Sequence, residues 1–160
     1  MKKMIMCGLL ALLLAACATK AERAAQLART SEQVTKALAD RHYKITVQTM
    51  TPRRGGSRPV TPDFMLEVRG DTLASYLPYF GRAYSIPYAG QGKGLHFTER
   101  IRDYTADRPK EGLTRIALRV TNEEDSYLFV INVFDNGQAT IDLQPREREH
   151  ISYGGEIDFD

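Results

Sequence analysis

Cysteine is almost missing from this sequence of 160 residues, which contains only Cys7 and Cys17, both close to the N-terminus. The remaining chain therefore has no pair of residues for a disulfide bond and no thiolate for nucleophilic or redox chemistry. Histidine is also scarce, and the three histidines form no His-x-x-His or His-x-x-Glu-His pattern, so the sequence predicts no zinc site. They are His42, His96 and His150.

Signatures of catalysis and of other bound ions are missing as well. No serine lies in a Gly-x-Ser-x-Gly elbow. The loop from Pro52 to Pro62 is rich in glycine and arginine but lacks the Lys-Ser/Thr ending and the following helix of a P-loop. The acidic triplet Glu123-Glu124-Asp125 lacks the alternating ligands of a calcium loop, so we favour a solvated turn over a calcium site. We therefore expect no enzyme activity, metal or cofactor.

Long apolar runs are limited to one, Met4 to Ala16, which follows Met1-Lys2-Lys3. A basic start followed by an apolar run too short to span a bilayer comfortably is typical of a signal peptide. The run ends in Leu14-Ala15-Ala16-Cys17, which matches the bacterial lipobox, where small residues precede a cysteine that is diacylated before cleavage. We therefore predict a signal peptide over residues 1–16 and a lipid on Cys17. An ordinary secretory signal is the alternative.

The predicted anchor also indicates a location. Several acyl chains on one cysteine exceed the marginal affinity of a single chain, so attachment to the membrane should be stable. Ala18 follows the cysteine, where an aspartate is the usual signal for retention in the inner membrane of enteric bacteria. No acidic cluster that resembles a surface-export signal follows Cys17. We expect a protein of the cell envelope, anchored in the outer membrane and facing the periplasm.

Net charge is absent from the predicted mature chain. The whole sequence has 22 basic and 20 acidic side chains, and the balance becomes even once Lys2 and Lys3 leave with the signal peptide. Binding to nucleic acid needs a net basic face, so we expect no nucleic-acid partner. No second long apolar run predicts a membrane span.

The mature chain begins with a predicted helix. Residues 17–37 are expected to form a lipidated tether and this helix, and residues 38–160 a single β domain. One narrow apolar stripe recurs at spacings of three and four, which favours a cover helix on the domain over a partner-binding coiled coil because it spans too few heptads. The stripe contains Ala24, Leu27, Ser31, Val34 and Leu38.

Beyond Asp40 the apolar period changes to two, which indicates strands. Asn136-Gly137 has the residues that a type I′ hairpin needs. About eight short-linked strands predict a mainly β protein, an antiparallel meander that either closes into a small lipocalin-like barrel or curls strongly to protect its edges. The expected strands are 43–49, 64–68, 72–77, 95–104, 115–120, 127–134, 139–143 and 151–157.

The segment Ser75 to Tyr88 is the most aromatic part of the chain. It contains five of the fourteen Tyr and Phe rings, with Pro78 and Gly81 between them. A proline cannot donate to a strand ladder, so we expect a short strand that breaks at Pro78 and turns back over the fold. We predict that Tyr79, Phe80 and Tyr84 are largely buried and that a carboxylate, with Glu156 as a candidate, or backbone carbonyls hold Arg82.

This segment also carries a resemblance to a known family. The run Tyr76-Leu77-Pro78-Tyr79-Phe80-Gly81-Arg82-Ala83-Tyr84 resembles the hallmark of a family of Bacteroidetes lipoproteins classed as a domain of unknown function. The likeness extends over roughly Leu38 to Ile157. It implies a lipocalin-like β-barrel behind a lipobox and implies no activity. Other matching positions are Gly94, Phe97, Tyr104, the strand of Tyr127, Gly137-Gln138-Ala139 and Ile151-Ser152-Tyr153-Gly154-Gly155-Glu156-Ile157.

Two classes of function fit these observations. The first is a barrel whose mouth binds a small apolar or amphipathic ligand, lined by tyrosines and with Arg82 receiving a polar group. The second is a structural or protein-interaction lipoprotein with a filled barrel, and large residues predicted to point inward favour this filled core. These inward residues are Phe64, Phe97, Leu118, Phe129 and Ile141. The ligand-binding residues expected for the first class are Tyr79, Arg82, Tyr84, Tyr88 and Tyr153.

Overall fold

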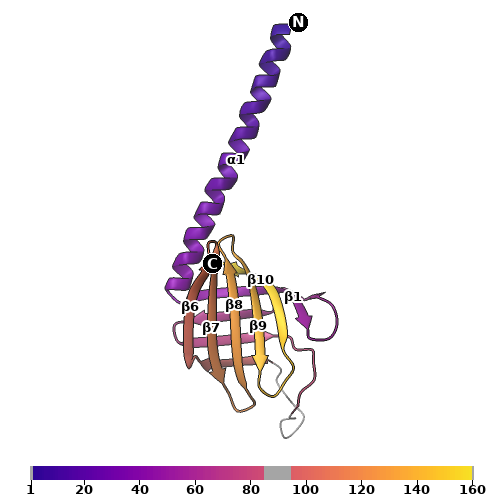
Figure 1. Ribbon diagram of the computed structural model, residues 1–160, viewed down its shortest axis with the longest axis vertical. Coiled ribbons are helices and arrows are strands. Elements are labelled where there is room, and N and C mark those ends of the chain that lie inside the picture. Colours follow the sequence, from indigo (N-terminus) through magenta and orange to yellow (C-terminus); the bar gives the residue numbers. More distant parts are fainter. Residues whose placement is uncertain (1, 85–94, 160) are drawn as a thin grey trace.

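The computed structural model describes residues 2–84 and 95–159, which form one helix followed by ten strands (Figure 1). The helix and the strands of the first half are α1 Lys2–Ala39, β1 His42–Pro52, β2 Arg58–Pro59, β3 Met65–Arg69 and β4 Thr72–Leu77. The strands of the second half are β5 Leu95–Arg100, β6 Asp103–Lys110, β7 Leu113–Thr121, β8 Ser126–Phe134, β9 Gln138–Pro145 and β10 Ile151–Asp158.

All strands belong to one antiparallel sheet, in the order β5-β4-β3-β1-β10-β9-β8-β7-β6, with the short β2 added to β1. The first and the last strand of the domain, β1 and β10, therefore pair in the middle of the sheet. Figure 1 shows β6 to β10 as a front layer and the purple-to-pink strands of the first half running across behind it. The sheet is thus curled into a half-barrel.

The mainly β antiparallel fold is confirmed, and of the two forms expected the structure has the strongly curled sheet and not the closed barrel of about eight strands. In the described part of the chain, β5 and β6 are the two edges of the sheet and do not pair with each other. The strand expected over residues 95–104 is divided at Ile101. The Ile101 amide donates to the carbonyl of Asp71, and the Arg102 amide donates to that of Arg119. The chain consequently crosses from one layer to the other at this point instead of forming a hairpin that would close the barrel.

The interior of the half-barrel is filled by side chains of the strands. Leu118, Phe129 and Ile141 are at most 1% exposed, as the alternating pattern predicted. Phe64 and Phe97, which were also expected to point inward, are only partly buried and pack against the same core. At about 25 cal/mol per Å² of apolar surface, burial of such a core is the main source of stability.

Only the last part of α1 packs on the sheet. Val34 and Leu38 are 1% and 9% exposed, whereas Leu27, on the same predicted stripe, is 56% exposed. The expected cover helix is therefore confirmed for its final turns, and the preceding turns project away from the sheet (Figure 1). In the part of the chain that the structure describes, no helix is long and apolar enough to cross a membrane.

Two glycines bring β10 unusually close to β1. The register of the two strands shifts between Val47 and Thr49, opposite Gly154 and Gly155. The extra residue of this β-bulge, Gln48, lies on β1. A Cβ atom added to Gly155 would overlap the carbonyl oxygen of Thr46. The close pairing at the centre of the sheet therefore requires glycine.

The expected turn at Asn136-Gly137 forms, but its type differs. The Gly137 amide donates to the carbonyl of Phe134 at 2.9 Å, and Gly137 has a φ of 88° while Asn136 does not have a positive φ. A type I′ turn needs positive φ at both central residues. The hairpin instead uses a tight turn followed by a left-handed glycine. Asn136 contributes its side-chain oxygen, which accepts from the Gln138 amide at 3.0 Å.

Candidate functional site

The aromatic segment leaves the sheet at Pro78, as the sequence predicted, because β4 ends at Leu77. Beyond it, the chain pairs with the loop between β9 and β10. The Tyr84 amide donates to the carbonyl of Glu147 at 2.7 Å, and the Glu149 amide donates to that of Arg82 at 2.9 Å. Ala83 and Arg148 form an isolated antiparallel bridge between these bonds. The backbone of residues 82–84 is therefore fixed.

Two tyrosine hydroxyls hold the beginning of the same segment. Tyr153 is 2% exposed and its hydroxyl donates to the carbonyl of Pro78 at 2.7 Å. The Tyr79 hydroxyl lies 3.0 Å from the carbonyl oxygens of both Arg82 and Glu149. Burial raises the pKa of the Tyr153 and Tyr79 hydroxyls, so both remain neutral donors at physiological pH. These two predicted site residues thus have clear structural partners.

The prediction that Phe80 and Tyr84 are largely buried was wrong. Their exposed fractions are 52% and 64%. The backbone groups of the segment bond to the neighbouring loop, and this arrangement leaves both rings facing outward. Tyr79 is half-buried. Tyr88 lies outside the described residues.

Arg82 is held through its backbone and not through its side chain, which is exposed. Its amide donates to the Glu149 carboxylate at 3.3 Å, and its carbonyl accepts from the Glu149 amide. The expected partner, Glu156, instead accepts a hydrogen bond from Gln48 at 2.8 Å. The guanidinium of Arg82 therefore remains available to a ligand or partner.

Three buried charges lie behind this segment, and the sequence analysis missed all of them. Asp125, Arg148 and Glu149 are 6%, 8% and 6% exposed. The Oδ1 atom of Asp125 accepts hydrogen bonds from the backbone amides of Ser126, Arg146 and Glu147, at 2.7, 3.0 and 3.1 Å. Asp125 is thus not part of a solvated turn, since it ties the β7–β8 turn to the β9–β10 loop.

The other two charges extend this connection toward the aromatic segment. The guanidinium of Arg148 lies 2.7 Å from the Glu124 carboxylate and 5.6 Å from the centre of the Tyr79 ring. An oxygen of Glu149 lies 3.7 Å from Nε of Arg54, in the loop after β1. Buried charges persist only when they are paired or hydrogen-bonded, and here each one is. No spacing rule in the sequence links these distant positions.

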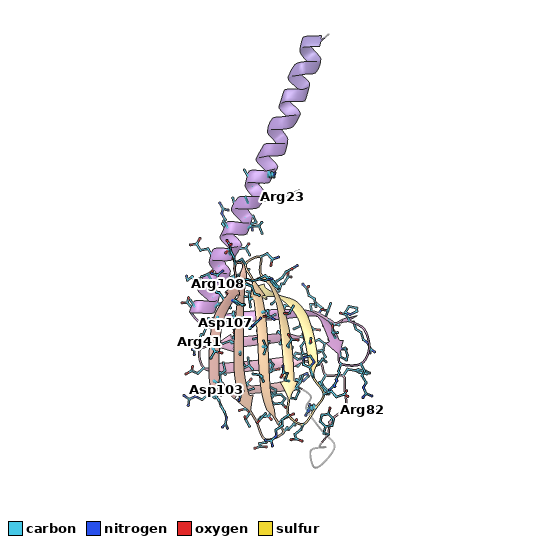
Figure 2. All side chains as sticks on the ribbon, in the orientation of Figure 1. Arg23, Arg41, Arg82, Asp103, Asp107 and Arg108 are labelled. Carbon is cyan, nitrogen blue, oxygen red and sulfur yellow. The ribbon has the colours of Figure 1, made fainter. Side chains whose placement is uncertain are left out.

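A surface cavity of about 350 Å³ opens where the aromatic segment meets the loop after β1. At its edge the guanidinium of Arg58 lies 4.6 Å above the ring of Phe80. Figure 2 shows Arg82 at the end of the molecule opposite Arg23, which lies on the projecting helix. The residues that line the cavity are Pro52, Arg54, Tyr79, Phe80, Gly81, Arg82 and Glu149.

A larger hollow of about 650 Å³ lies between the end of α1 and strands β1 and β3. Two ion pairs lie along it, with Lys44 2.6 Å from Asp158 and Arg69 2.6 Å from Glu67. Across residues 2–84 and 95–159, no cluster of His, Cys, Asp and Glu is arranged to hold a metal ion.

Comparison with known proteins identifies a family. The sequence matches the family described as Domain of unknown function (DUF4251) over residues 25–157. The crystal structure of a DUF4251 family protein from Bacteroides eggerthii is similar to this structure with a TM-score of 0.61 and 15% sequence identity, over 80% of this chain and 86% of that chain. Likeness at this identity shows the fold alone. No curated protein matches the chain.

Proposed function

This chain belongs to the DUF4251 family of domains of unknown function, and from that membership and its structure we propose that it is a lipid-anchored, non-catalytic protein of the cell envelope that acts through contacts at its surface. One observation carries the proposal, namely that the half-barrel is filled by its own side chains, such as Phe129 and Ile141. A small barrel or half-barrel can be filled or hollow, and a filled one leaves no room for an interior ligand.

The surface role is also supported by the segment that the sequence singled out for ligand binding. The hydroxyls of Tyr79 and Tyr153 bond to backbone carbonyls of the protein itself. Arg82 and Tyr84 instead point into solvent from a fixed backbone. This division favours an interaction protein over a carrier of a small apolar ligand.

Native mass spectrometry of the detergent-released protein, purified from its own host, tests the filled interior. We expect the mass of the lipidated chain with no further small molecule, because the core residues occupy the space that an apolar ligand would need. A stoichiometric additional mass that is released on denaturation would contradict the proposal.

The helix suits the role of a stalk. Residues 20–29 are exposed along the projecting part of α1 (Figure 1). With a rise of 1.5 Å per residue, the seventeen residues from Cys17 to Gln33 span about 24 Å. A lipid on Cys17 would then hold the sheet away from the membrane. Ala18 in place of aspartate supports the outer membrane, with the domain in the periplasm.

Replacing Cys17 with serine is expected to release the protein from the membrane fraction and to abolish labelling by radioactive palmitate, because the only acylated thiol is lost. The matched control is Cys7→Ser, which changes a cysteine inside the predicted signal peptide and should leave both anchoring and labelling intact. Labelling that survives in the Cys17→Ser protein would contradict the proposed anchor.

A further inference from the structure

Five exposed side chains come from the two segments that meet at the cavity of about 350 Å³. Arg54 and Arg58 come from the chain that follows β1, and Phe80, Arg82 and Tyr84 come from the aromatic segment. The Arg54 side chain is 67% exposed, and the guanidinium of Arg58 covers one side of the Phe80 ring at 4.6 Å. We call these five residues the arginine–aromatic face.

The backbone under this face is held in place. Residues 82–84 pair with residues 147–149 through two backbone hydrogen bonds. Asp125 fixes the amides of Arg146 and Glu147, so the loop on which the segment rests is itself tied to the β7–β8 turn. A surface that is ordered before binding loses less conformational entropy when a partner arrives. The face is therefore pre-organised, although its side chains do not contribute to the core.

The composition of the face is that of a protein interface. Arginine and aromatic residues are enriched at interfaces and dominate their binding energy, whereas lysine is depleted. All the cations of this face are arginines. An exposed Phe and an exposed Tyr next to them would otherwise remain in contact with water, which is unfavourable for apolar rings.

The charge of the face identifies the partner's chemistry. Within the described residues, its three arginines make one ion pair, between Arg54 and Glu149 at 3.7 Å. Glu149 is 6% exposed and also accepts the amide of Arg82, so it adds little negative charge to the surface. An excess of positive charge remains. Guanidinium groups bind carboxylates through two parallel hydrogen bonds, in a geometry that lysine cannot reproduce.

We propose that the arginine–aromatic face binds a segment of a protein partner that is rich in Asp and Glu. Carboxylates of the segment bind Arg54 and Arg82, and an apolar side chain between them packs against the Phe80 ring at the cavity. This inference rests on the proposed interaction role and adds the chemistry of the partner. An anionic membrane suits the face less well, because Figure 2 places Arg82 at the opposite end from the helix that leads to Cys17.

Fluorescence anisotropy with synthetic peptides tests this inference on the full chain in detergent. The probes are a labelled peptide of glutamates interrupted by phenylalanines and the same peptide with lysine in place of glutamate. We expect saturable, salt-sensitive binding of the glutamate peptide alone. The double variant Arg54→Ala, Arg82→Ala should weaken it at least about tenfold, since two charge-assisted contacts are lost. Phe80→Ala should also weaken binding of the glutamate peptide, but it should change the salt dependence of binding less than the double variant does.

The matched control removes two exposed arginines elsewhere, Arg115 and Arg119 on β7, and should bind like the unchanged protein. Equal loss in this control would mean non-specific attraction and would overturn the inference. So would tighter binding to anionic vesicles than to the glutamate peptide, which would assign a lipid instead. If no probe binds, the inferred chemistry of the partner is wrong. The proposed function still stands in that case, provided that the protein stays anchored to the membrane and no interior ligand is found. An interior ligand overturns the proposed function itself.

Discussion

Gly155→Ala is expected to destabilise the protein by roughly 3 kcal/mol or more, because overpacking a tightly packed site forces backbone shifts. The new Cβ would overlap the carbonyl oxygen of Thr46 and would lie 3.1 Å from Cα of Val47. Both neighbours are backbone atoms of β1, and they pair with β10 at the centre of the sheet. β1 cannot move away from the new Cβ without breaking the hydrogen bonds to β10 that join the two halves of the half-barrel.

The measurement is the free energy of unfolding from urea titration followed by circular dichroism. Gly56→Ala is the matched control, because Gly56 has no neighbouring atom within 4 Å of an added Cβ and its φ is not in the left-handed region. Its stability should remain close to that of the unchanged protein. If Gly155→Ala left the free energy of unfolding equally unchanged, this would contradict the conclusion that β10 lies too close to β1 for a Cβ atom at position 155.

Asp125→Ala should have the second large effect, a loss of roughly 3 kcal/mol, because several backbone amides lose their acceptor in a buried place. The carboxylate accepts from Ser126, Arg146 and Glu147, and of these amides Arg146 also donates to the Ser126 carbonyl at 3.0 Å. The variant should also bind the glutamate peptide more weakly, since the loop that supports the aromatic segment loses its attachment.

Glu123→Ala tests the same acidic triplet without removing a buried group, because Glu123 is exposed. Its urea midpoint should remain unchanged. Equal midpoints for the Asp125 and Glu123 variants would show that Asp125 is a surface residue, as the sequence pattern had suggested.

The strands themselves were predictable from the sequence. Period-two alternation placed Ile45 and Val47 in β1 and Leu118 in β7, and an apolar run from Tyr127 to Phe134 predicted β8; these residues and Phe129 lie in the core. This pattern is local, since every second residue of a half-buried strand faces the same side. Membership of a family of unknown function was also expected and is confirmed over residues 25–157, whereas the hallmark motif and the lipid anchor stay predictions.

Closure of the barrel and the environment of the aromatic segment were not predictable, because both depend on contacts between distant residues. Whether β5 pairs with β6 is decided by the crossing at Ile101, where the bonding partners are Asp71 and Arg119. The exposure of Phe80 follows from the pairing of residues 82–84 with residues 147–149. The sequence of neither segment indicates that it pairs with the other. Asp125 was likewise assigned to solvent, because a triplet of acidic residues does not reveal that its last member binds amides twenty residues away.

The most direct test of the account is the unfolding free energy of Phe80→Ala, measured by urea titration beside that of Phe129→Ala. The Phe80 ring, 52% exposed, belongs to the proposed binding surface, whereas the Phe129 ring, 0% exposed, fills the core. We therefore predict a loss within about 1 kcal/mol for Phe80→Ala and of roughly 3–5 kcal/mol for Phe129→Ala. A loss of several kcal/mol for Phe80→Ala would place its ring in the core and contradict the account.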